Sequence, residues 1–150
     1  MKTLKMLCIG SCLALCLAMS SGVSANLQNY GRQYYSSWNY YPSRGYHYSY
    51  YYYKPQPDYA SYNHHYCVHY PSQPRYVYYY NPYSQAYWGR FDTEGKDGAQ
   101  YSLLKQEDRK KTLKEIPESA FPKPASMPGV PESEDGETIA PIKELPKATN

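Results

Sequence analysis

Residues 78–89 read YYYNPYSQAYWG, and this stretch decides the expected fold. The dipeptide Asn81-Pro82 is typical of a turn, and it separates two aromatic segments. Tyrosine and tryptophan favour strands because their flat rings pack on a pleated surface. Aromatic pairs that face each other across neighbouring strands stabilise a sheet by roughly 0.2–1 kcal/mol each. The stretch therefore predicts a β-hairpin.

Similar runs of strand-forming residues lie on both sides of this hairpin, and turn residues such as Pro, Asn and Gly separate them. Tyrosine dominates these runs, because 21 of the 58 residues from Tyr30 to Tyr87 are Tyr. The expected strands span residues 47–53, 62–70, 75–80, 86–92 and 100–104. The sequence thus favours a small antiparallel all-β module, an aromatic-rich meander, over residues 45–104. The alternative is that this zone is a disordered low-complexity segment.

Aliphatic residues are scarce outside the first 25 residues. From Asn26 onward only 13 of 125 residues are Leu, Ile, Val or Phe, a fraction typical of disordered chains. So small an aliphatic content excludes a doubly wound sheet and a roomy enzyme cleft. We expect disordered segments on both sides of the module: an extended polar leader over 26–44 and a Pro/Glu-rich tail over 117–150. Between module and tail, residues 102–116 favour a short helix that ends at Pro117.

The first 25 residues have the pattern of a secretory signal peptide. Two early lysines precede an apolar or small run over residues 6–19, and Val23-Ser24-Ala25 favours cleavage after Ala25. One alternative is a membrane anchor, for which the apolar run is short. Another is lipidation of Cys12, which follows a lipobox-like Ile-Gly-Ser. We expect a mature protein without a transmembrane span, secreted or held in the periplasm or cell envelope.

Cleavage would leave a single cysteine, Cys67, so that no disulfide can form within one molecule. A lone exported cysteine is a free thiol, one half of a disulfide between two molecules, or a metal ligand, and we expect some disulfide-linked dimer. On a strand, His65, Cys67 and His69 share one face. Imidazole and thiolate are ligands of Zn²⁺ and copper, so these three residues form a candidate Zn or Cu site. The alternative is a surface strand that is rich in histidine.

The sequence favours a binding protein over an enzyme. It has no phosphate-binding loop, dinucleotide fingerprint or pair of catalytic carboxylates, and no other cofactor is expected. Five cations over residues 26–90 are few for stacking on nucleic acid, so no nucleic-acid partner is expected. Tyrosine supplies large, rigid contact area at low entropic cost. We expect a non-enzymatic protein that uses its tyrosine-rich surface for self-association or for binding polysaccharide or protein of the envelope, with metal binding as the alternative.

Several short motifs follow one another along the chain. They are RYVYYYNP at 75–82, YWGR at 87–90, YSLL at 101–104, EIPE at 115–118, AFP at 120–122 and VPES at 130–133, followed by Asp135-Gly136. Together they resemble a set of small exported tyrosine-rich proteins of planctomycete bacteria, and the resemblance covers residues 45–137. It implies bacterial export, and it implies no activity and no functional residues.

Overall fold

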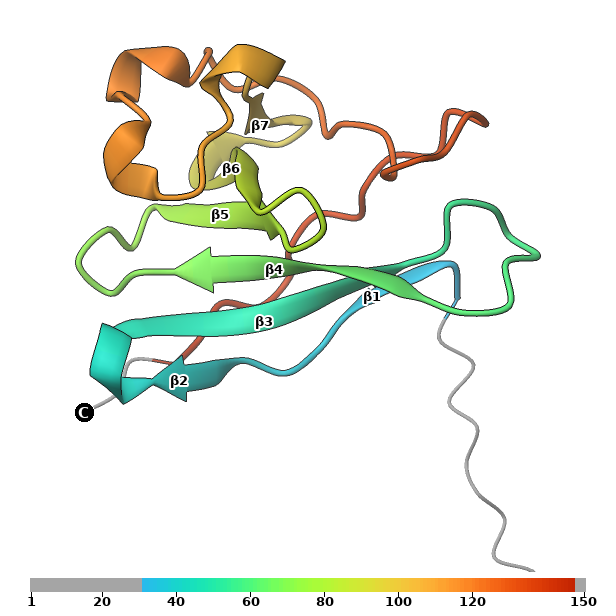
Figure 1. Ribbon diagram of the computed structural model, residues 1–150, viewed down its shortest axis with the longest axis horizontal. Coiled ribbons are helices and arrows are strands. Elements are labelled where there is room, and N and C mark those ends of the chain that lie inside the picture. Colours follow the sequence, from blue (N-terminus) through green and yellow to red (C-terminus); the bar gives the residue numbers. More distant parts are fainter. Residues whose placement is uncertain (1–30, 148–150) are drawn as a thin grey trace, which may run out of the picture.

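A computed structural model describes residues 31–147 of the chain, and in it a single curled antiparallel sheet forms the body of the molecule (Figure 1). The sheet contains seven strands in the order β1-β3-β4-β5-β6-β7, and β2 also pairs with β3. The strands are β1 (Gln33–Tyr35), β2 (Asn39–Tyr41), β3 (Tyr46–Tyr53), β4 (Asn63–His69), β5 (Tyr76–Asn81), β6 (Ala86–Lys96) and β7 (Ala99–Leu103). The predicted signal peptide over 1–25 lies outside the described residues.

The predicted antiparallel all-β fold is confirmed. The five expected strands appear as β3 to β7, joined in sequence order as a meander. Burial along β3 alternates strictly, because successive side chains of a strand point to opposite faces. Tyr51 and Tyr53 therefore lie in the core, while Tyr50 and Tyr52 lie on the outer face and are half-buried.

The leader is extended, as expected, but the expectation of disorder is wrong from residue 33 onward, where the leader belongs to the sheet. β1 pairs with the C-terminal half of β3 and β2 with its N-terminal half. Between these two paired regions the leader has one more residue than β3. Ser36 lies at this extra residue and pairs with Tyr50: the Ser36 N–H donates to Tyr50 O at 2.9 Å, and Ser36 Oγ accepts from Tyr50 N at 2.9 Å. A strand edge offers unpaired N–H and C=O groups, which explains why a polar leader pairs with it.

The short helix predicted for residues 102–116 is wrong. β7 extends through Leu103, and the rest of the stretch contains only single 3-10 turns. These turns are η2 (Gln106–Asp108) and η3 (Leu113–Glu115), and a further turn, η4 (Glu118–Ala120), follows the stretch. An isolated helix of this length is unstable in water. Buried Leu104 and Ile116 instead fix the loop at two points, and the loop bends between them.

The tail differs most from the expectation of disorder, because residues 123–147 pack across the core face of the sheet. Figure 1 shows this segment running behind the sheet to a position near β2. Val130 and Ile139 are only 2% and 1% exposed and belong to the core. Tyr101 and Ala125 exchange two backbone hydrogen bonds of 2.9 and 2.8 Å. Residues 123–147 therefore form a second layer, although they contain no strand or helix.

Polar side chains of the leader hold this second layer in place. Arg32 forms an ion pair with Asp135 at 2.5 Å, and Trp38 Nε1 donates to Glu144 O at 2.8 Å. Gln33 donates to Thr138 O at 2.9 Å. Ordering a tail residue costs roughly 1–2 kcal/mol of backbone entropy. These hydrogen bonds and the burial of a few aliphatic side chains against aromatic rings offset that cost.

The core between sheet and tail is mainly aromatic. Its buried members are Tyr51, Tyr53, Cys67, Val77, Tyr79, Trp88, Phe91, Tyr101, Val130 and Ile139. A buried phenol needs a partner for its hydroxyl. Tyr51 donates to Gln33 Oε1 at 2.8 Å, and the hydroxyls of Tyr79 and Tyr35 are 2.7 Å apart. Tyrosine can therefore replace the missing aliphatic residues as core material.

Candidate functional site: a tyrosine-lined cleft

The three residues of the predicted metal site lie together on the core face of β4. His65, Cys67 and His69 share this face, as the strand pattern predicts, and all three are buried. The alternative interpretation as a histidine-rich surface strand is therefore wrong. Because Cys67 has 0% exposure, its sulfur is out of reach of a second molecule, and the expectation of a disulfide-linked dimer does not fit the folded chain.

Each of these side chains is engaged with a different neighbour. His65 Nε2 lies 3.3 Å from Tyr53 Oη, and His69 Nε2 lies 3.1 Å from Pro74 O. Burial raises the pKa of the Cys67 thiol, so the sulfur keeps its proton. Among residues 31–147, no three His, Cys, Asp or Glu side chains are grouped closely enough to hold a metal ion. The Zn or Cu site at His65, Cys67 and His69 stays a prediction.

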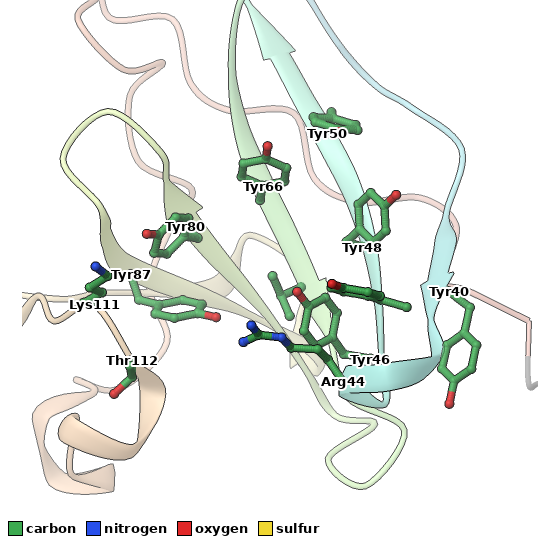
Figure 2. Close-up of a pocket in the computed structure, with 12 residues that line it drawn as sticks. Tyr40, Arg44, Tyr46, Tyr48, Tyr50, Tyr66, Tyr80, Tyr87, Lys111 and Thr112 are labelled. Carbon is green, nitrogen blue, oxygen red and sulfur yellow. The ribbon is translucent and has the colours of Figure 1, made fainter.

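The opposite, outer face of the sheet carries a second set of tyrosines and is hollowed into a cleft of about 610 Å³. This volume lies within the roughly 300–1,000 Å³ range of small-molecule sites. Figure 2 shows the tyrosine side chains standing on the curled strands around the hollow. The lining residues are Tyr40, Tyr41, Arg44, Tyr46, Tyr48, Tyr50, Tyr66, Val68, Tyr80, Tyr87, Lys111 and Thr112.

Four of these tyrosines form a continuous row across β3, β4, β5 and β6. Tyr50 lies opposite Tyr66, Tyr66 opposite Tyr80, and Tyr80 opposite Tyr87 in the strand register. The three ring-centroid distances along the row are 5.0, 6.4 and 5.0 Å. We call these four residues the tyrosine row. Since neighbouring strands hold it in register, the row is a rigid aromatic surface rather than a set of separate side chains.

A register shift in the last hairpin completes the row. β5 and β6 pair Tyr79 with Gly89 but Tyr80 with Tyr87, so the register changes by one residue between Tyr79 and Tyr80. A one-residue shift moves side chains to the other face of a sheet. The shift places Tyr87 beside Tyr80, as the last member of the tyrosine row. Trp88 stays in the core, where the centroid of its ring lies 5.3 Å from that of Tyr79.

Two phenols of the cleft, those of Tyr50 and Tyr87, stay protonated at neutral pH. Desolvation is the larger cause of the raised pKa of Tyr50, and the neighbouring Tyr66 is the smaller one. Desolvation, followed by Tyr70, raises the pKa of Tyr87. A neutral phenol both donates and accepts hydrogen bonds. The cleft thus combines apolar ring surface with hydroxyl groups that can pair with a polar ligand.

Two turns place cationic side chains at the rim. Arg44 ends the single-turn helix η1 (Pro42–Arg44), and Gly45, at φ 65°, turns the chain into β3. Opposite this turn, the Tyr87 N–H donates to Lys110 O at 2.9 Å and thereby fixes the backbone beside Lys111. Figure 2 shows the Arg44 guanidinium directed toward Tyr87, with Lys111 beyond it.

The segment after β7 covers the outer face beside the cleft. Arg90 lies between the rings of Tyr76 and Phe121, 3.8 and 4.0 Å from their centroids, and forms an ion pair with Glu118 at 2.5 Å. This stacking attaches η4 to β5 and β6. On the sheet, the opening therefore lies over β2, β3, β4 and the ends of β5 and β6.

Comparisons with known proteins add no further information. No family model, no curated protein and no solved structure matches the chain. The resemblance to small exported planctomycete proteins stays a hypothesis. None of the helices within residues 31–147 is long and apolar enough to cross a membrane.

The tyrosine-rich surface can be predicted from the sequence, whereas the cleft cannot. Over residues 46–49 tyrosine alternates with His47 and Ser49 in the sequence, which indicates one face that carries the tyrosines; residues 50–53 are all Tyr and give no such signal. No comparable pattern in the sequence indicates that Arg44 and Lys111 line a cleft, or that Tyr80 pairs with Tyr87. Their places depend on a turn, a loop and a register shift, each of which is set by tertiary contacts.

Proposed function

We propose that this protein binds an extended polysaccharide in the tyrosine-lined cleft and catalyses no reaction. The tyrosine row, which spans four strands on the outer face, is the observation that carries the proposal. Carbohydrates present apolar ring faces bordered by hydroxyl groups. A surface of aromatic rings that carry hydroxyl groups matches both features, and the strand face of the OB-fold is one example of a sheet that binds oligosaccharides.

The shape of the cleft favours a ligand over self-association. A symmetric dimer joins the same patch of two copies, which must therefore be complementary to itself. A hollowed surface placed against its own copy leaves a void between them. A narrow polymer, in contrast, fills a hollow of about 610 Å³ without such a void.

The chemistry of the lining favours binding without catalysis. Among the described residues that line the cleft there is no carboxylate, histidine or cysteine. Hydrolysis of a glycosidic bond ordinarily needs a pair of carboxylates. The proposed setting outside the cytoplasm, in the periplasm, cell envelope or medium, rests on the predicted signal peptide over residues 1–25.

The proposal is tested by affinity electrophoresis of the purified protein in gels that contain a polysaccharide. The probes are polygalacturonate, its fully methyl-esterified form, dextran sulfate and dextran. We expect at least one of them to retard the protein. Tyr66→Ala should remove most of that retardation because it interrupts the tyrosine row, whereas Tyr66→Phe, which keeps the ring, should retain part of it.

Tyr59→Ala is the matched control, because Tyr59 is 47% exposed and does not line the cleft. It should leave retardation unchanged. Thermal unfolding of each variant separates lost binding from lost folding. Absence of retardation by all four polysaccharides would contradict the proposal, and a concentration-dependent dimer that Tyr66→Ala abolishes would favour self-association instead.

A further inference from the structure

We propose, on the basis of the proposed function, that the polysaccharide is anionic. Of the residues that line the cleft, all of them within the described part of the chain, only Arg44 and Lys111 carry a charge, and both are cations. Carboxylate or sulfate groups on a sugar polymer would supply the opposite charge. The tyrosine row would then bind the sugar rings, and the two cations would bind their substituents.

Arg44 is the more informative of the two cations, because its guanidinium has no hydrogen-bond or ion-pair partner among residues 31–147. The other arginines of that region are all engaged. Their partners are Asp135 for Arg32, Asp92 for Arg75, Glu118 for Arg90, and Leu104 O for Arg109. A planar guanidinium binds carboxylate or sulfate through two parallel N–H groups. Arg44 keeps these donors available.

The backbone around Arg44 directs its charge into the cleft. The Gly45 N–H donates to Tyr41 O at 2.9 Å, which closes the turn and orients the residue before it. The Arg44 charge acts on Tyr46, another residue that lines the cleft. It opposes the rise in the pKa of Tyr46 that desolvation and Tyr70 cause. Figure 2 shows the guanidinium lying among the tyrosine side chains.

Lys111 provides the second cation from the opposite wall. Its neighbour Lys110 turns back onto its own loop, where Nζ donates to Glu107 O at 2.7 Å. The nearby Glu115 carboxylate is engaged by Thr112, whose backbone N–H and Oγ1 donate to it at 3.1 and 2.7 Å. Glu115 does not line the cleft, but its charge partly offsets that of Lys111.

The inference is tested by comparing each anionic polymer with its neutral counterpart. Polygalacturonate and its methyl ester share one backbone, as do dextran sulfate and dextran. We expect the protein to bind at least one anionic polymer about tenfold more tightly than the neutral form at low ionic strength. The pair that shows the preference distinguishes carboxylate from sulfate. The preference should fall in 0.5 M salt, because the Debye length shrinks to a few ångström.

Charge variants assign the preference to the cleft. The double variant Arg44→Gln/Lys111→Gln should lose the preference, so that the gel with the anionic polymer and the gel with its neutral counterpart retard it equally. Lys96→Gln/Lys123→Gln is the matched control, because it removes the same net charge from residues outside the cleft. It should keep the preference. Glu115→Gln, which can still cap the turn at Thr112, should strengthen anionic binding about twofold.

The outcomes separate this inference from the proposed function. Equal binding of anionic and neutral polymers, with the dependence on Tyr66 intact, would overturn the anionic inference alone. A preference that survives in Arg44→Gln/Lys111→Gln would also overturn it, since the charge would then be sensed elsewhere. Absence of binding to all four polymers would overturn both proposals.

Discussion

The hydroxyl of Tyr35 lies 2.7 Å from the hydroxyl of Tyr79 and also donates to Ala140 O at 2.7 Å. Since the single Tyr35 proton is directed at the carbonyl, Tyr79 is the donor between the two phenols. This contact joins β1, the central strand β5 and the tail. A tyrosine core thus depends on hydroxyl partners that come from distant parts of the chain.

Tyr35→Phe should lower the free energy of unfolding by about 1–3 kcal/mol, because it removes the hydrogen bonds that Tyr35 forms with the buried Tyr79 hydroxyl and with Ala140 O. Urea denaturation measures the effect. Tyr41→Phe is the control, because Tyr41 is exposed and should change stability little. The double variant Tyr35→Phe/Tyr79→Phe should be more stable than Tyr35→Phe. A Tyr35→Phe protein as stable as the control would contradict this network.

Ile139→Ala should destabilise the protein by about 2–5 kcal/mol, because it leaves a cavity between the tail and the sheet. Leu145 lies in the same tail but is 43% exposed, so Leu145→Ala should change stability by at most about 0.5 kcal/mol. Thermal unfolding of the two variants compares them directly. Equal melting temperatures would mean that the tail does not pack on the core.

Gly89→Ala should be strongly destabilising, because a Cβ at this position would lie 2.5 Å from the Tyr101 ring and 2.7 Å from Ser102 O. The backbone oxygen cannot move without disturbing the pairing of β6 with β7. Gly129→Ala serves as the control, since its Cβ would meet only Glu137 O at an ordinary 3.7 Å. Circular dichroism melts should show a large loss for Gly89→Ala alone, and similar melts would contradict the close approach at Gly89.

Stability should fall as the pH decreases from about 6.5 to about 3. Desolvation, followed by the nearby His64, lowers the pKa of His65 from 6.5 to about 3. Between these values the unfolded chain binds the proton and the folded chain does not, so each pH unit costs up to about 1.4 kcal/mol. The contribution of His65 to stability is fully present above pH 6.5, and it has been lost completely below pH 3.

His65→Gln tests this assignment through the slope of stability against pH. Between pH 5 and 6.5, where most carboxylates stay ionised, the slope should decrease by up to about one proton relative to the wild type. The slope is informative even if the substitution lowers stability at every pH. An unchanged slope would show that the His65 imidazole is not buried in its neutral form.

Cys67 should react with iodoacetamide only when the protein unfolds, because the thiol is buried and its raised pKa keeps it protonated. The labelling rate should rise with urea in parallel with unfolding, and a non-reducing gel should show monomer. A chelator should leave the rate unchanged. Labelling that begins only after a chelator is added would instead identify a metal bound by His65, Cys67 and His69.

The sequence by itself determined the strands of the meander and the two faces of the sheet. Turn residues mark the ends of β3 to β7, and strand-forming residues fill them, so both signals are local. The strand period also places His65, Cys67 and His69 on one face without any tertiary information. It does not specify which face is covered, and this is why a candidate surface strand is in fact part of the core.

Only the tertiary structure decided what covers the core and where the cleft opens. Composition indicated disorder for the tail because the tail itself contains few aliphatic residues. A count along the chain does not include the aromatic rings that β3, β5 and β6 supply, and these rings stabilise the buried Val130 and Ile139. The cleft likewise needs the register shift at Tyr80 and the hydrogen bond between Tyr87 and Lys110. Such contacts join residues that are distant in sequence, and their free energy arises only when the curled sheet has brought the partners together.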